Sequence, residues 1–138
     1  MLILSPRTVR FGGAEWEDVT AVIIDRQAKR TVTEWSDLGP HTVLADAPEQ
    51  LVTVRVVQQV ARDDVGTPVP GESAELAFAT APAGGDSPRR RVRAECVVTD
   101  VTHELSLRNG AVRTVKLVAV SSDGATDPVT VEDADGID

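Results

Sequence analysis

The sequence predicts a mainly β protein: an antiparallel β-sandwich or barrel-like domain with at most one short helix. Three observations point to this class. Runs that alternate apolar and polar residues recur along the chain, those runs are rich in Val and Thr, and the two longest flank Arg108-Asn109-Gly110. Asn-Gly tolerates the positive φ angles of a tight hairpin turn, so these two runs form a long closing hairpin. With 138 residues, the chain has the length of one domain and can bury a core.

The expected strands follow one another in order. Thr8 to Phe11 leads into a Gly-Gly turn, and Glu15 to Asp25 contains a stretch that is apolar on both faces, which is typical of a central strand. Lys29 to Trp35, Leu51 to Val60 and Glu72 to Thr80 alternate in the manner of strands with one buried face. Together with the closing hairpin, these segments make about seven strands.

The closing hairpin comprises Arg91 to Leu107 and Ala111 to Val120, and its first strand changes phase. Apolar residues occupy even-numbered positions up to Val98 and odd-numbered positions from Val97 onward. One inserted residue moves every later side chain to the opposite face, so this change predicts a β-bulge near Val97 to Thr99. A hairpin this long either bends at the bulge or finds part of its partner surface on another subunit.

Two connections are long for a compact domain, Ser36 to Glu49 and Ala81 to Arg90. Connections of this length tend to be functional or disordered. The first contains Leu38, Val43 and Leu44, apolar residues that a solvated loop does not need. We interpret it as an arm that docks on a neighbouring subunit; the alternative is a local strand that returns to the same sheet.

The net charge of −8 is concentrated near the C-terminal end. Six acidic residues and no basic residue follow Val120, which leaves a charge of −2 for residues 1–120. We therefore divide the chain into a β domain, residues 1–122, and an acidic tail, residues 123–138, that is expected to be flexible. A nearly neutral body is not attracted non-specifically to DNA, because phosphate binding requires clustered Lys and Arg.

Residues that commonly carry chemistry do not form a site in this sequence. His41, His103 and the single Cys96 lack metal-ligand spacing. Gly85-Asp86-Ser87 is similar to the nucleophile segment of chymotrypsin-like proteases, but Pro88 stands where that motif needs glycine, and the chain is too short for two barrels. We expect no catalytic residue, no cofactor and no metal, and therefore a protein that is not an enzyme.

The remaining signals concern location and surface charge. The apolar opening Met1 to Leu4 is too short for a signal-peptide core or a membrane span, so we expect a protein made in a cytoplasm. Cys96 is expected to be a small buried residue. The basic cluster at residues 89–91 is interpreted as a solvated edge that protects the sheet from pairing; the alternative pairs it with carboxylates of an adjacent subunit.

The order of these elements resembles the tail tube proteins of tailed bacteriophages and related contractile injection systems. The resemblance covers most of residues 7–120. It rests on an opening hairpin (Val9 to Gly13, then Val19 to Asp25), a long loop, a regular strand (Leu51 to Val60), a second strand (Glu72 to Ala79) and a closing hairpin (Arg91 to Val120). The helix that usually packs against the sandwich in this family has no clear counterpart here.

The resemblance implies a structural function. Members of the family form hexameric rings whose inner sheets join into one barrel, and the rings stack into a hollow tube that conducts DNA into the host. The long loop typically contacts the next ring, which implies axial contacts at Trp35, Leu38, Pro40, His41, Val43 and Leu44. Lateral or outer contacts are expected at Arg89, Arg90, Arg91 and Asn109. A conduit should not retain its cargo, so small polar residues are expected in the lumen, and the candidates are Thr53, Thr99 and Arg55, which shares a face with Thr53.

The expected protein is thus a tail tube subunit of a virion, assembled in the host cytoplasm. Its partners are further copies of itself, together with sheath, tape-measure and baseplate proteins, while DNA passes without specific binding and no membrane is involved. Two alternatives stay open: a related tail component, such as a tube initiator, a tube terminator or a baseplate hub protein, and a monomeric β-sandwich binding module. Ring formation separates the assembly functions from the monomeric one.

Overall fold

The computed structural model describes residues 2–4, 6–61, 66, 68–80, 90–108 and 110–133, with Leu2–Leu4, Arg7 and Asp133 described by their backbone alone. These residues form nine antiparallel strands and no helix, which confirms the mainly β class. None of them therefore belongs to a helix that could cross a membrane. The strands are β1 (Leu2–Leu4), β2 (Arg7–Phe11), β3 (Ala14–Glu15), β4 (Val19–Trp35), β5 (Thr42–Gln59), β6 (Ser73–Ala79), β7 (Arg90–Ser106), β8 (Gly110–Ala119) and β9 (Thr130–Asp133).

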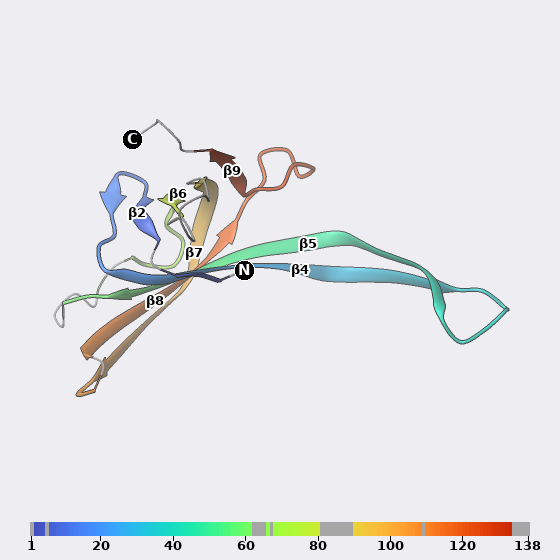
Figure 1. The fold of residues 1–138 in the computed structure, drawn as a ribbon, viewed down its shortest axis with the longest axis horizontal. Helices are drawn as coiled ribbons and strands as arrows, with labels where there is room; N and C mark the ends of the chain where they lie inside the picture. The colour runs from blue at the N-terminus through green and yellow to red at the C-terminus, as the bar shows by residue number, and fades with distance from the viewer. Residues whose placement is uncertain are drawn as a thin grey trace, which may run out of the picture.

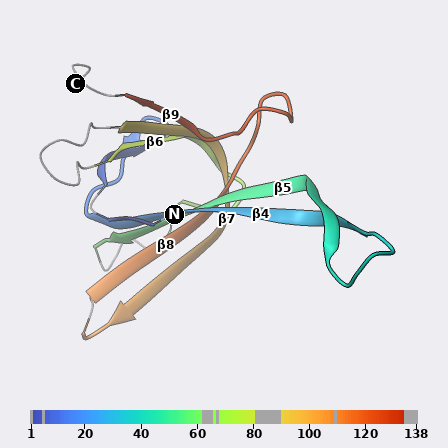
Figure 2. The same ribbon diagram turned by 45° about the vertical axis from the view of Figure 1, so that its right-hand side comes forward.

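All nine strands belong to one sheet, in the order β1-β4-β5-β8-β7-β6-β2-β3, with β9 paired to β7. The sheet curls strongly, so that β2 and β6 lie opposite β4, β5 and β8 (Figures 1 and 2). Within the described ranges, β1 and β3 are the two edge strands of this order, and they do not pair with each other. The curl is therefore barrel-like but open.

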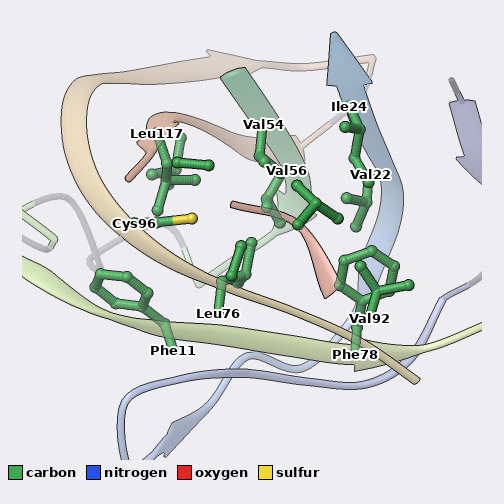
Figure 3. Close-up of a cluster of buried hydrophobic side chains, with 14 of the residues drawn as sticks. Phe11, Val22, Ile24, Val54, Val56, Leu76, Phe78, Val92, Cys96 and Leu117 are labelled. Carbon is green, nitrogen blue, oxygen red and sulfur yellow. The ribbon is translucent and has the colours of Figure 1, made fainter. Parts of the chain in front are cut away.

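Apolar side chains from both sides of the curl fill its interior (Figure 3). Val22, Val56 and Leu117 come from β4, β5 and β8, and all three are fully buried. Leu76 and Phe78 of β6 lie across from them and are also buried. This confirms the inward faces expected for the segments 51–60 and 72–80. Burial of such apolar area, worth about 25 cal/mol per Å², is the main term that stabilises the fold.

Cys96 is part of the same core, as expected from the sequence. Its burial raises the pKa of the thiol to about 12, and the nearby Glu95 carboxylate adds a smaller rise. The thiolate is the reactive form of cysteine, so this side chain is chemically inert in the folded protein.

The largest departure from the expected strands concerns β4 and β5. The sequence predicted two strands, Glu15 to Asp25 and Lys29 to Trp35, and a connection over Ser36 to Glu49, but β4 is one continuous strand and β5 begins at Thr42. The pairing register shifts around Pro48, between Arg30 opposite Glu49 and Val32 opposite Asp46. A proline is tolerated at such an irregularity, because no ladder hydrogen bond is required of it there. The connection is therefore only Ser36–His41, and for Thr42–Glu49 the alternative of a strand that returns to the same sheet is confirmed.

The closing hairpin and its bulge are confirmed. β7 and β8 pair from Ser106 opposite Gly110 to Cys96 opposite Ala119, with one register shift between Val98 and Asp100. Gly110 has a φ of 69°, which fits the tight turn that Asn-Gly indicated.

The acidic segment also differs from the flexible tail that was expected. Val129 is buried in the core, and β9 continues the ladder along β7 beyond the end of β8. The segment from Val120 to Pro128 connects β8 to β9. It lies beside the place where β4 and β5 leave the body (Figure 1). The last five residues, 134–138, lie outside the described residues.

Candidate functional site

The most prominent surface feature is a two-stranded ribbon that projects from the body (Figures 1 and 2). β1 pairs with β4 only over Ala21–Ile23, and β8 pairs with β5 only over Val52–Gln59. Among the described residues, the outer parts of β4 and β5 therefore pair only with each other. We call residues 26–50 the arm. An isolated two-stranded ribbon is marginally stable in water, which favours a contact surface for it in the functional state.

The far end of the arm gathers large apolar side chains in solvent. All side chains from Arg26 to Asp46 are exposed. Leu38 at the turn is 96% exposed and Val43 is 64% exposed. We call the set Trp35, Leu38, Val43 and Leu44 the arm tip. Pro40 and His41 lie in the same turn, so the structure brings together all six residues expected to make axial contacts, at the end of one ribbon.

The turn at the arm tip is held by local contacts. The Leu38 backbone N–H donates to Ser36 Oγ over 3.3 Å, and no core contact fixes the exposed side chains. The apolar side chains of the arm tip thus do not contribute to the core of the subunit.

A hollow lies at the other end of the arm. It is lined by residues of the arm base, the end of β8 and the segment 121–128, and its volume is about 630 Å³. Two of the lining residues form an ion pair: Arg26 Nη2 on the arm contacts Asp127 Oδ2 over 3.0 Å, which joins the arm to the segment 121–128. We call this feature the root hollow; its lining includes Arg26, Pro48, Gln50, Leu51, Val52, Ala119, Val120, Ala125, Asp127 and Pro128.

Asp123 organises the segment that walls the root hollow. Its carboxylate accepts hydrogen bonds from the backbone N–H groups of Thr126 and Ala125, over 2.8 and 2.9 Å, and from the hydroxyls of Thr126 and Ser121. Gly124 takes a φ of 82°, which glycine adopts without strain. These donors hold the pKa of Asp123 well below its ordinary value. The Asp123-Gly124 turn signal was present in the sequence but was assigned to a flexible tail.

The depressed pKa of Asp123 gives a pH prediction. Because the folded pKa lies below the unfolded one, the ionised carboxylate stabilises the turn above the ordinary Asp pKa of about 3.9, and this support is lost only as pH falls through the lower folded value. In an NMR titration, the amide shifts of Ala125 and Thr126 should stay constant through about pH 3.9 and change at lower pH. The Asp123→Asn variant should lack that transition. A midpoint at the ordinary Asp value would contradict the hydrogen-bonded turn.

A buried polar cluster closes one end of the core. The Arg113 guanidinium carbon lies 5.1 Å from the centroid of the Trp16 ring, and Arg113 Nη2 donates to Gln58 Oε1. Gln58 Nε2 in turn donates to the Glu17 carbonyl over 2.6 Å. A partnered buried cation of this kind fixes the packing of the strands that carry it. Its members are far apart in the sequence, so no local pattern could have indicated it.

The expected lateral and lumen residues are dispersed. Arg89 and Asn109 lie outside the described residues. Arg90 and Arg91 face the chain's own β9 in the pairing register, where Arg91 lies opposite Glu132, and Arg93 forms an ion pair with Glu132 over 3.1 Å. Arg91 and Arg93 therefore lie beside the Glu132 carboxylate of the same subunit.

Thr53, Arg55 and Thr99 do not form one exposed patch. Thr53 is buried, whereas Arg55 and Thr99 are exposed. Thr99 lies at the bulge of β7, where its hydroxyl donates to the Lys116 carbonyl over 3.2 Å. The three residues thus remain separate candidates.

The described residues contain no group of three or more His, Cys, Asp or Glu side chains placed to hold a metal ion. Comparison with models of known families and with curated proteins finds no significant match. The candidate functional site is accordingly defined by its geometry: an arm with an apolar tip at one end and a hollow at the other.

Proposed function

We propose that the protein is a structural, non-enzymatic subunit of a phage-type tail tube, which forms hexameric rings that stack into a conduit for DNA. The observation that carries the proposal is the arm, an exposed ribbon whose far end gathers large apolar side chains. Contiguous apolar groups on the surface of a soluble protein usually mark a contact with another molecule. An arm that reaches beyond its own body suits contact with the next ring.

Unpaired strand edges favour further copies of the same chain as the partner. Among the described residues, β1 and β3 end the sheet, and the outer edges of the arm strands have no partner of their own. Such edges invite pairing with another chain, and in a closed ring each copy supplies the same partner to the next. The open curl of the sheet is compatible with completion by neighbours.

The charge of the outer sheet face agrees with a conduit that does not retain DNA. Lys116 lies between Arg55 and Asp100 on neighbouring strands, and all three side chains are exposed. A surface of mixed sign attracts phosphate weakly compared with a basic cluster. In this proposal, sheath, tape-measure and baseplate proteins are further partners of the tube in the virion tail, and no cofactor takes part.

The direct test is assembly of the purified protein. We expect light scattering to show growth above the monomer mass as concentration rises, and negative-stain microscopy to show rings or tubes with a central channel. Apolar contacts strengthen in sulfate, so tube formation should increase with ammonium sulfate. A monomer at every concentration and salt tested would contradict the proposal, and single rings that never stack would indicate a tube-end component instead.

A further inference from the structure

We infer that the root hollow of one copy receives the arm tip of a neighbouring copy. This inference rests on the proposed assembly function and adds the surface that the arm contacts. The tip and the hollow lie at opposite ends of one ribbon, so each subunit carries both halves of the contact. Nothing in the subunit itself fills the hollow or covers the tip among the described residues.

The geometry makes this contact repeat. Placing the tip of one copy in the hollow of the next displaces the second copy along the arm. The contact is heterologous, because the two surfaces differ, and it leaves a free tip at one end of the pair and a free hollow at the other. Identical steps can therefore continue without limit, which is how rings stack into a tube.

The length of the arm sets the size of the step. Nine residue steps separate Arg26 at the hollow from Trp35 at the tip. At about 3.3 Å per residue of extended strand, they span about 30 Å, and the turn adds a few ångströms. The inferred contact therefore implies an axial repeat of about 30 to 40 Å.

The two surfaces share apolar groups, although polar side chains such as Gln50, Ser121 and Thr126 also line the hollow. The tip contributes Trp35 and Leu38, with Asp37 as the one formal charge of the turn. The lining of the hollow includes Leu51, Val120 and Pro128, and Val120 is 48% exposed in the isolated subunit.

The charges at the hollow favour an apolar occupant. Arg26 and Asp127 already neutralise each other over 3.0 Å, so neither of these two charges is left unpaired when the apolar side chains of a tip enter. The volume of about 630 Å³ has room for a few side chains and not for a folded domain, which fits a turn. A charged occupant would find no free counter-charge in the Arg26–Asp127 pair.

The wall of the hollow is already ordered before contact. Asp123 holds the segment 121–126 through four hydrogen bonds, and the buried Val129 anchors its far end. A surface with this degree of order loses little conformational entropy when it binds, so a small contact area can suffice.

Disulfide trapping tests the inference in the full-length chain. The variant Leu38→Cys/Ala125→Cys places one thiol on the arm tip and one on the hollow, and Cys96 gives little background because it is buried. A disulfide requires Cα atoms within about 7 Å, so mild oxidation of assembled protein should convert monomer into a ladder of covalent oligomers. Both single variants should remain monomeric on a non-reducing gel.

The matched control is Leu38→Cys/Leu107→Cys, which pairs the tip with the exposed end of the β7–β8 hairpin, where Leu107 is 98% exposed. Equal ladders from both double variants, or dimers from Leu38→Cys alone, would overturn the inference. Tubes that form normally without the Leu38–Ala125 crosslink, or with an axial repeat far from about 30 to 40 Å, would overturn it while the proposed function stands. If the unmodified protein forms no assembly at all, the proposed function fails, and the inference fails with it.

Discussion

Replacing Leu38, Val43 and Leu44 together by serine is expected to abolish stacking while the subunit stays folded. All three side chains are exposed on the arm, so their loss should change the free energy of unfolding by no more than about 0.5 kcal/mol each. At an interface, each fully buried apolar side chain contributes about 1.5 to 3 kcal/mol, and the three act together in every copy. Thermal unfolding and negative-stain microscopy of the same sample measure the two effects.

A control for this variant exists on the same arm. Serine at Thr31, Thr33 and Thr42 alters the same ribbon without removing a large apolar group, and assembly should persist. Unfolding of the Leu38/Val43/Leu44 variant as a monomer would assign those residues to the core. Normal tubes from it would show that the arm tip makes no essential contact.

The second large effect is a loss of stability, expected when Leu117 in the core is replaced by alanine. Leu117 on β8 is 0% exposed, and truncation to alanine leaves a cavity in the core that the close-packed interior fills only in part. Such a change costs about 2 to 5 kcal/mol, out of a total of about 5 to 15 kcal/mol for a typical domain. A fall of the urea midpoint at unchanged slope would measure this loss directly.

Leu107 provides the matched control for this variant. It is the same residue type, at the turn of the same hairpin, but it is 98% exposed. Leu107→Ala should shift the urea midpoint little, because it uncovers no cavity. Equal losses from the two variants would mean that the hairpin end is buried in solution.

Several parts of the fold could be predicted because they depend on local pattern. Buried and exposed positions alternate along β6 and the inner half of β5, and the bulge near Thr99 was indicated by the shift in that alternation. Asn109-Gly110 indicated the closing turn, because few dipeptides accept its backbone angles.

The two-stranded form of the arm could not be predicted, because the alternation of buried and exposed positions is a signal of strands that pack on a core. Alternation indicates that one face of a strand is buried. It predicted Lys29 to Trp35 as a strand, but the buried face expected there was wrong, because the arm buries neither face. Ala45 to Glu49 therefore lacks the pattern of a strand and contains a proline, although its backbone pairs with β4 around that site. The apolar residues of the tip were nevertheless recognised, because their chemistry in a supposed loop needed an explanation.

Local patterns were sufficient to predict the β class, the closing hairpin with its bulge, the inward faces of the core strands and the apolar character of the arm tip. Each of these depends on residues that are close in the chain. Long-range contacts, by contrast, make β4 and β5 leave the body together, return the acidic segment to the sheet through Val129 and β9, and bring Arg26 and Asp127 together beside a hollow. These features bring together residues that are distant in the sequence, and such pairing is chosen by packing and complementary charge across the whole fold, which no local periodicity records.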